Sequence, residues 1–396
     1  MARLYGVESF YFIFFFFLVF YVLCFEIVYS TPKKRHHLHT PKRRHHLHTP
    51  KRKYYFYFAV FLLLFIMAGM RGVTVGGDLK RYLPEYHAII SAPLGALTHY
   101  GRHEIGYLIY IKLLSLISPT DRCFLIGTSF ASLIGPICMF FKFSKKGSVS
   151  VLLYYAMGYY TNTYNNIRQS IALSVIFIIL PFLINRDFKK YMIGVLVATS
   201  FHYSALLMMF VYPLYTRNIS AKRILIYASS MLLGAVALGY TLLSYISEII
   251  TKYNPEEFDN EAEGGGYGLF FFYLLIFVAI SVFYVMRRRK MTKKQRKMMS
   301  MFVLFQIFAM TIQLTAPIFH SMVRGTYYFF IPVATLAVPL IYSMIRRRVF
   351  KLAFYSIVFV FAVYYMIGVY SYKPEIGNNS QANIPYVFIN KDLFSY

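Results

Sequence analysis

Cysteine is scarce in this chain, and the three that occur, Cys24, Cys123 and Cys138, all lie in apolar segments. An odd number of cysteines without metal-ligand spacing argues against a disulfide framework and against a zinc site. Acidic residues are also few, 15 against 42 lysines and arginines, and they form no paired-acid motif that would hold a divalent metal. The chain contains no glycine-rich phosphate loop and no nucleophile elbow. We therefore expect no metal and no cofactor.

Apolar residues, in contrast, are abundant: 58% of the chain is hydrophobic and 20% is aromatic. Soluble domains average about 45–50% apolar residues and lack repeated runs that are long enough to span a bilayer. The sequence therefore predicts an all-α polytopic membrane protein with about 10–12 membrane helices, some of them re-entrant or half-helices. The runs of spanning length are 10–29, 54–70, 123–141, 149–164, 167–184, 224–245, 267–285, 301–318, 327–345 and 349–370.

Two further stretches are harder to place. Residues 105–118 are short and contain Lys112, which suits a re-entrant or interfacial helix, and residues 191–215 are interrupted at His202. If 105–118 does not cross and 191–215 forms a hairpin, six basic loops face the cytoplasm, as the positive-inside rule requires. These loops carry 30 of the 42 lysines and arginines and comprise residues 30–53, 142–147, 185–190, 217–223, 287–297 and 346–351.

The alternative topology treats both stretches as single spans. It places two basic loops outside and moves Arg168 to the cytoplasmic face. We expect the first arrangement, which puts residues 71–104, Arg168, His202 and Arg324 outside. The net charge of +27 is then mainly a topology signal, with attraction to the lipid bilayer as a second effect, and we expect no nucleic acid partner.

A repeat with a period of nine, "TPKKRHHLHTPKRRHHLHTPKRK", occupies residues 31–53 and holds six of the eleven histidines. It can be a metal-binding tract or a duplicated basic linker, and we expect the linker because no acidic residue accompanies the histidines. The apolar run 10–29 lacks a signal-peptide shape, since its basic flank follows it. We therefore divide the chain into residues 1–53, an extra helix with this linker, and residues 54–396, the polytopic domain.

Candidate functional residues collect on the predicted outer face. Asp78, Tyr82 and Tyr86 recur at four-residue spacing and lie on one helical stripe, which is also the pattern of an amphipathic interfacial helix. Glu104 opens the next apolar segment, with Tyr107 almost one turn later.

Arg168 begins a long apolar helix and has three amide neighbours, Asn165, Asn166 and Gln169. A helix start with an arginine and amides describes an anion site, although an arginine can also extend to lipid headgroups. Arg324 repeats this arrangement with His320 four residues before it, and His202 is a third polar group on this side.

Several segments resemble the EpsG family, which is part of the broader group of Wzy-like bacterial surface polysaccharide polymerases. They run in order from about residue 54 to 387 and comprise Arg71 with "GGDLKRYLPEY", then "HEIGYLIYIKLL", "NNIRQSIALSVIF", "ATSFHYSALLMMF", "RGTYYFFIPVA" and "NIPY". Ile105 stands where the family pattern favours proline after the glutamate, and the histidine repeat has no counterpart.

The resemblance implies a GT-C-like helical bundle that carries out inverting, metal-independent glycosyl transfer on the outer face of the bacterial cytoplasmic membrane. The donor would be an oligosaccharide on polyprenyl diphosphate, and a flippase and a chain-length regulator would be possible partners. A departing diphosphate needs positive charge, which Arg168 and Arg324 can supply. Asp78 or Glu104 would be the general base.

The other residues that this resemblance implies for the site support these roles. His202 and Gln169 would add hydrogen-bond donors, and Tyr82, Tyr86 and Tyr107 would offer a surface for the sugar. Arg71, Asn165 and His320 complete the candidates for substrate binding.

Two other functions remain open. A flippase or transporter of lipid-linked oligosaccharide would also need arginines, but it predicts an internal repeat of helices, which we do not find. A membrane acyltransferase acting on sugar would use His202 or His320 as its base, and neither histidine has an adjacent nucleophile.

Overall fold

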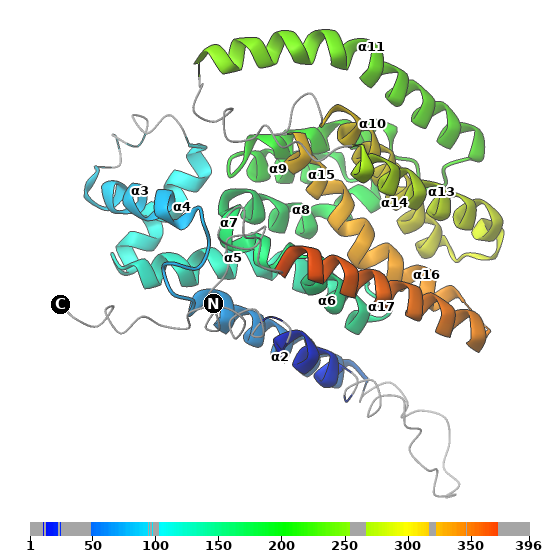
Figure 1. Ribbon diagram of the computed structural model, residues 1–396, viewed down its shortest axis with the longest axis horizontal. Helices are drawn as coiled ribbons and strands as arrows, with labels where there is room; N and C mark the ends of the chain where they lie inside the picture. Colours follow the sequence, from blue (N-terminus) through cyan, green and yellow to red (C-terminus); the bar gives the residue numbers. More distant parts are fainter. Residues whose placement is uncertain are drawn as a thin grey trace, which may run out of the picture. The chain divides into compact units, whose positions relative to one another are not determined.

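The computed structural model describes residues 11, 13–22, 24, 49–93, 95, 97, 103–253, 267–316, 322–345 and 347–370 (Figure 1). This part of the chain is helical and contains no strand. Five of its helices are long and apolar enough to cross a membrane, namely Asp121–Phe143, Ile167–Asn185, Gly268–Lys290, Lys293–Thr315 and Val323–Met344. The shorter apolar helices are Ile13–Val22, Lys53–Gly69, Ile105–Ile117, Gly147–Ala156 and Tyr203–Leu214. The predicted all-α polytopic class is confirmed. The histidine repeat before residue 49 and His320 lie outside the described residues.

The chain divides into two compact units, of which the first comprises Met1–Ile178, Ser200–His202 and Val338–Tyr396. In this unit α2 (Thr49–Gly69) packs antiparallel against α5 (Asp121–Phe143). The hydroxyl of Tyr57 donates to the Phe140 carbonyl at 2.9 Å, and Nη1 of Arg122 donates to the Gly69 carbonyl at 2.7 Å. These two contacts secure the pair at both ends, so each helix begins where the other ends.

Two shorter helices, α3 (Leu79–Ser91) and α4 (Ile105–Ile117), lie side by side (Figure 1). Nζ of Lys112 donates to the carbonyls of Ile89 and Ile90, at 3.2 and 2.8 Å, and so caps the end of α3 with a positive charge. A helix of this length rises about 20 Å, less than the hydrocarbon core of about 30 Å. As expected, 105–118 is a short helix, and its lysine is satisfied by a neighbouring helix end.

The single span predicted at 149–164 is wrong. Gly158 has a φ of 72°, in the left-handed region that glycine adopts without a steric cost. The chain is therefore broken into α6 (Gly147–Ala156) and α7 (Tyr159–Asn165). After Asn166 it starts again as α8 (Ile167–Asn185). An apolar composition is compatible with both arrangements, so hydropathy did not reveal the break.

The second unit, Ile179–Thr199 with Tyr203–Ala337, contains the predicted hairpin. Helix α9 (Phe188–Thr199) is followed by the 3₁₀ segment η2 (Tyr203–Phe210) and the short α10 (Val211–Leu214). Nη1 of Arg186, before α9, donates to the carbonyl of Tyr215, after α10, at 2.7 Å. The chain thus returns to its starting point, which confirms two short segments in place of one span.

The rest of this unit consists of longer helices: α11 (Ala221–Tyr253), α13 (Gly268–Arg287), the 3₁₀ turn η3 (Arg288–Lys290), α14 (Lys293–Thr315) and α15 (Met322–Pro332). Helix α14 begins before the apolar run at 301. Thr292 and Gln295 form a capping box there, in which each side chain accepts from the other residue's backbone N–H. Hydropathy misses this start because the first two turns are mostly basic.

Beyond α15 the helix widens into a π-turn, η4 (Val333–Ala337), and continues as α16 (Val338–Met344). Pro339 explains this widening of the helix. In a regular α-helix its ring would clash with the carbonyl of Thr335, and its backbone nitrogen carries no hydrogen to donate to that carbonyl. The last described helix is α17 (Arg348–Tyr370).

The predicted cytoplasmic loops group together within each unit. In the first unit, Nζ of Lys53 lies 5.1 Å from the centre of the Phe141 ring, and Nζ of Lys146 lies 6.0 Å from that of Tyr342. Lys53, the segment 141–146 and the end of α16 at Tyr342 are therefore neighbours.

The same grouping occurs in the second unit. Nη2 of Arg217 donates to the Asn185 carbonyl at 2.7 Å, and the Tyr215 hydroxyl donates to the Lys297 carbonyl at 3.2 Å. In each unit, described residues from the predicted cytoplasmic loops or next to them are thus close together, and the side of the membrane that they face stays a prediction.

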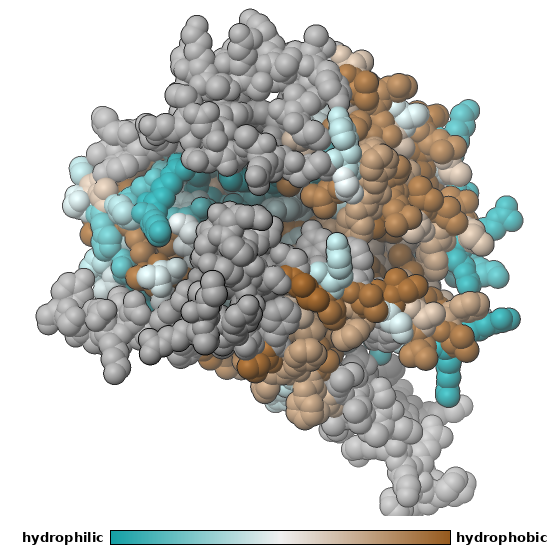
Figure 2. Space-filling model, viewed as in Figure 1, coloured by the Kyte–Doolittle hydropathy of each residue, from teal (hydrophilic) through white to brown (hydrophobic). Residues whose placement is uncertain are grey.

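Apolar side chains cover much of the visible described surface (Figure 2). Helix α4 exposes a stripe at helical spacing, Ile105, Ile109, Leu113 and Leu116. Helix α13 does the same with Phe271, Leu275, Val278 and Val282. Stripes of this kind are suited to contact with lipid.

Candidate active site

Glu104 is the centre of a polar cluster in the first unit. It stands directly before α4, and its neighbours Gly106 and Tyr107 donate their backbone N–H groups to the Ser200 carbonyl at 2.8 and 3.2 Å. A Cβ on Gly106 would lie 2.2 Å from Oγ of Ser200, so only glycine permits this approach. The start of α4 is therefore fixed against the turn that carries His202, about a hundred residues later.

Both carboxylate oxygens of Glu104 are bound. Oε2 lies 2.5 Å from Nη1 of Arg168, and Oε1 lies 3.0 Å from Nδ1 of His202. Glu104 is only 2% exposed. Burial raises its pKa, but the hydrogen bond from His202 and the charge of Arg168 outweigh burial and lower the pKa to about 2. Glu104 is therefore a carboxylate near neutral pH, and Nδ1 of His202 carries the proton of the hydrogen bond between them.

Arg168 occupies the first turn of α8, immediately after the break at Asn166. Its Nε donates to the Tyr82 hydroxyl at 3.2 Å, and its Cζ lies 5.8 Å from the centre of the Tyr82 ring and 6.0 Å from that of Tyr107. The anion that meets this arginine within the chain is thus Glu104, and two tyrosines surround the pair.

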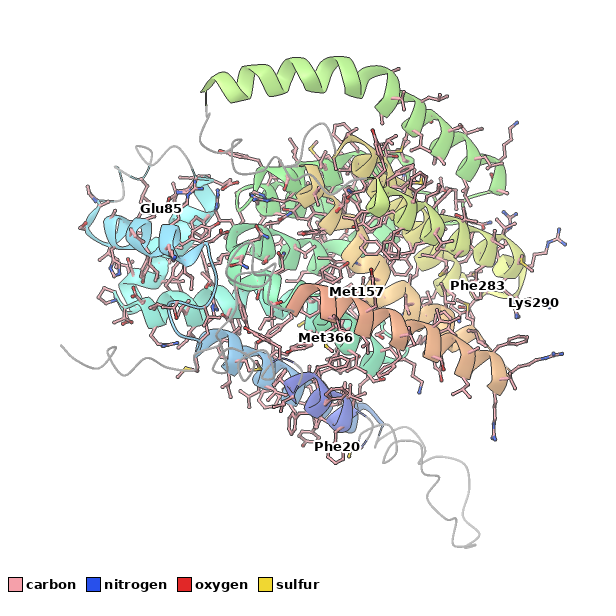
Figure 3. All side chains as sticks on the ribbon, in the orientation of Figure 1. Phe20, Glu85, Met157, Phe283, Lys290 and Met366 are labelled. Atoms are coloured by element: carbon pink, nitrogen blue, oxygen red, sulfur yellow. The ribbon has the colours of Figure 1, made fainter. Side chains whose placement is uncertain are left out.

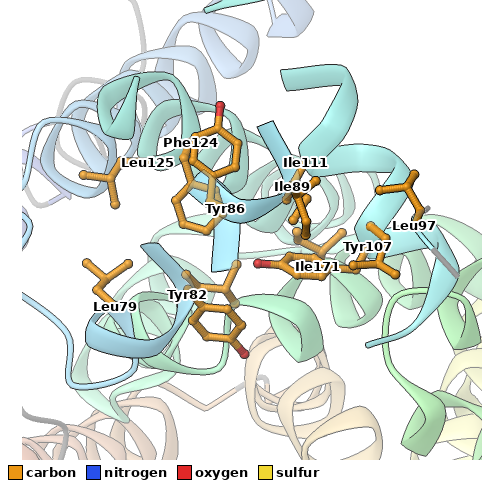
Figure 4. Packing of buried hydrophobic residues seen from close by; sticks show 12 residues of the cluster. Leu79, Tyr82, Tyr86, Ile89, Leu97, Tyr107, Ile111, Phe124, Leu125 and Ile171 are labelled. Atoms are coloured by element: carbon orange, nitrogen blue, oxygen red, sulfur yellow. The ribbon is translucent and has the colours of Figure 1, made fainter. Parts of the chain in front are cut away.

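The two tyrosines of α3 on the predicted stripe, Tyr82 and Tyr86, contact different partners. Tyr82 lies beside Tyr107, with ring centres 6.0 Å apart, whereas Tyr86 packs against Phe124 and donates its hydroxyl to the Ser118 carbonyl (Figure 4). Four residues rise about 6 Å along a helix, so two residues of one stripe can contact different partners. Tyr82 and Tyr107 belong to the polar cluster, and Tyr86 belongs to the apolar core.

Asp78 is exposed and precedes the first residue of α3, one turn before Tyr82. Its negative charge contributes to the raised pKa of Tyr82, after the larger effect of burial. Asp78 is therefore within electrostatic range of the cluster, although it stands in a more solvated position than Glu104.

Arg71 is 1% exposed and stabilises the turn before α3. It donates to backbone carbonyls, among them that of Val75 at 3.3 Å, and its Cζ lies 4.6 Å from the centre of the Tyr164 ring. A Cβ on Gly76 would lie 2.8 Å from the Tyr164 carbonyl and 3.3 Å from Oδ1 of Asn165. Arg71 and Asn165 thus lie where this turn meets α7, and Gln169, next to Arg168, is 3% exposed.

Arg324 belongs to the second unit, where it is exposed near the start of α15. The next residue, Gly325, packs closely against η2 and α14, since its Cβ would lie 3.1 Å from Leu207 and 3.7 Å from Ile312. Arg324 is therefore an exposed side chain on a part of α15 that packs closely against its neighbours.

Sequence reasoning missed two histidine–carboxylate pairs. Nε2 of His103 lies 2.9 Å from Oε2 of Glu85, on α3 (Figure 3), and Nε2 of His87 lies 2.7 Å from Oδ1 of Asp121. The position of His103 beside Glu104 was the available signal. Among the described residues, no group of three or more His, Cys, Asp or Glu side chains is arranged to hold a metal ion.

Comparisons with known proteins give one result. No curated protein and no solved structure matches the chain. The EpsG family model matches residues 54–388, which includes the described helices from α3 onward and therefore Glu104, Arg168 and His202. This multi-pass membrane protein belongs to the EpsG family.

Proposed function

We propose that this protein polymerises the repeat units of a bacterial surface polysaccharide by inverting glycosyl transfer. The donor is an oligosaccharide on polyprenyl diphosphate, and the acceptor is a second lipid-linked unit. Membership of the EpsG family suggests a polysaccharide polymerase-like role. The observation that carries the proposal is the buried cluster of Glu104, Arg168 and His202, surrounded by Tyr82 and Tyr107.

The cluster suits a diphosphate leaving group. A guanidinium has five N–H donors, and the bonds to Glu104 and Tyr82 engage Nη1 and Nε. Glu104 fixes the plane of the group without using all its donors, so Arg168 can also bind phosphate oxygens. Because the diphosphate gains negative charge as it departs, this interaction strengthens in the transition state and lowers the barrier. Arg324, which lies in the second unit, stays a prediction from the sequence for this role.

The arrangement of α8 supports an outward-facing site. Arg168 lies at its start, and Asn185, at its end, accepts a hydrogen bond from Arg217 of a basic loop. A helix of 19 residues is about 28 Å long, close to the thickness of the hydrocarbon core. With the basic loops in the cytoplasm, Arg168 faces the outside of the cytoplasmic membrane, where lipid-linked repeat units are joined.

The test is polymer formation in vitro from purified lipid-linked repeat units. Arg168→Ala should reduce the rate by about 10²–10³-fold, and Arg168→Lys should be impaired less because it keeps the charge without the bidentate fork. The matched control is Arg223→Ala, an exposed arginine at the start of α11 in a basic loop, which should polymerise normally. Near-normal polymer from folded Arg168→Ala would show that the assignment is wrong.

The same assay separates the alternatives. A flippase would give no polymer from purified units and would fail only where transport is needed. An acyltransferase would transfer an acyl group and leave the diphosphate bond intact.

A further inference from the structure

His103 and Glu85 form a second ion pair beside the Glu104 cluster, with side chains that are 4% and 26% exposed. The backbone at Glu104 is extended, with φ −66° and ψ 136°, so its side chain and that of His103 point in different directions. Glu104 contacts Arg168 and His202, whereas His103 contacts Glu85 on α3. The neighbouring residues His103 and Glu104 thus belong to two separate polar groups.

The geometry of this pair sets the tautomer of His103. Nε2 lies 2.9 Å from Oε2 of Glu85, and a carboxylate accepts only, so Nε2 carries the proton. The pKa of Glu85 lies below its usual value because His103 and Arg81 beside it outweigh the opposing effect of burial. When only Nε2 carries a proton, Nδ1 is a proton acceptor, as in histidines that a carboxylate orients for catalysis.

Two buried polar atoms beside this pair make no hydrogen bond with any described residue. They are Nδ1 of His103, whose side chain is 4% exposed, and the hydroxyl of Tyr107, a residue that is 1% exposed. Oε2 of Glu85 is a third such atom, since it lies at ion-pair distance from Nε2 of His103 without the geometry of a hydrogen bond. The two rings lie 6.0 Å apart in an edge-to-face arrangement. An unpaired buried polar atom is unfavourable, and a bound hydroxyl that donates to Nδ1 and accepts from Tyr107 would pair both atoms.

Inversion favours His103 over Glu104 and His202, which both belong to the ion-paired cluster of Arg168. The attacking hydroxyl must approach the sugar from the face opposite to the leaving diphosphate, so the base and the diphosphate site must be separate. His202 shares Glu104 with Arg168 and therefore lies on the leaving-group side. His103 pairs with Glu85 and not with Glu104, so it belongs to a different polar pair from Arg168, although its ring centre and Cζ of Arg168 each lie 6.0 Å from the centre of the Tyr107 ring.

We propose that His103, oriented by Glu85, is the general base of the glycosyl transfer and that Nδ1 with the Tyr107 hydroxyl forms the subsite for the acceptor sugar's hydroxyl. The inference rests on the proposed function. The hydroxyl proton moves to Nδ1 while its oxygen bonds to the anomeric carbon. The bond from that carbon to the diphosphate oxygen breaks, and its electron pair leaves with the diphosphate beside Arg168. Glu85 stabilises the imidazolium that forms.

The experiment uses azide, an anionic nucleophile that needs no base. The full-length protein is given lipid-linked repeat units with and without sodium azide, and polymer and glycosyl azide are measured. His103→Gln keeps an N–H for Glu85 but cannot accept the proton. It should lose polymerisation by about 10²–10⁴-fold and still form glycosyl azide at the wild-type rate. The matched control, His87→Gln, alters the half-exposed pair with Asp121 and should leave both products unchanged.

The other outcomes are decisive. Arg168→Ala should lose both products, because leaving-group stabilisation serves either nucleophile. If His103→Gln folds and loses both products, or retains both, His103 is not the base. Glu85→Gln provides a second variant that keeps the acceptor for Nε2, and it should lose polymer while retaining glycosyl azide. If the wild-type protein forms neither product, the proposed function itself is wrong, and this assignment falls with it.

Discussion

Nη1 of Arg168 lies 2.5 Å from Oε2 of Glu104, although 64 residues separate them in the chain. The side chains are 16% and 2% exposed, so both charges are largely removed from water. A charged pair with so little solvent needs both members, because either one alone would leave an unpaired buried charge. The ion pair therefore positions the guanidinium of Arg168, and the fold depends on both members.

We expect strong coupling between these two residues. Arg168→Ala and Glu104→Ala should each lower the free energy of unfolding by about 3–5 kcal/mol, because each leaves the partner charge unpaired. The double variant should be destabilised by much less than the sum of the two. Unfolding in mixed micelles with increasing sodium dodecyl sulfate measures all three. Additive losses would show that the two charges do not depend on each other.

The stability of the protein should depend on pH through Glu104. Its pKa falls from an ordinary 4.5 to about 2 in the folded state. The contribution, on the order of 3 kcal/mol for such a shift, is fully present above pH 4.5 and is lost as pH falls from 4.5 towards 2. The difference in unfolding free energy between wild type and Glu104→Gln should therefore shrink below pH 4.5. A difference that stays constant from pH 7 to 3 would contradict the depressed pKa.

Gly106→Ala should disrupt the site without touching a charged residue. The new Cβ would lie 2.2 Å from Oγ and 2.7 Å from the carbonyl of Ser200, which forces the turn with His202 away from Glu104. The rate of an enzymatic reaction falls about 100-fold when a reacting group is displaced by about 1 Å, so we expect the rate of polymer formation to fall by a factor of that order.

Gly234→Ala is the control for this substitution. A Cβ there meets nothing within 4 Å, and alanine favours a helix over glycine by about 0.5–1 kcal/mol. Polymer formation should be unchanged and stability equal or higher. If both glycine variants behave alike, close packing at Ser200 does not hold the site together.

The orientation in the membrane can be tested by labelling. In a variant with its three native cysteines replaced, Lys145→Cys and Phe188→Cys, both at exposed positions, should resist a membrane-impermeant thiol reagent added to intact cells. Asp259→Cys, in the predicted outer loop, should react. Detergent-permeabilised cells give the control, since all three positions should then be labelled. Reaction at 145 and 188 from outside would place Arg168 in the cytoplasm and remove the proposed site from the outer face.

The sequence by itself determined the class of the protein and many of its parts. A long apolar run is recognisable from the sequence alone, because it is hydrophobic over enough residues to cross the thickness of a bilayer. The hairpin at 191–215 was also predictable, since the basic loops around it require both ends on one side. Arg168, Glu104 and His202 stood out as single polar residues at the edges of such runs. Their roles in catalysis stay predictions.

Only the tertiary structure decided which of these residues meet. The approach of Gly106 to Ser200 pairs Glu104 with Arg168 and His202, a contact between segments far apart in sequence that no local pattern encodes. The break at Gly158 depends on one backbone angle in a run that is apolar throughout. The only sequence signal at His103 is its position beside Glu104. Its pairing with Glu85 on α3 was not predictable, because the direction of a side chain is set by backbone geometry and packing rather than by residue type.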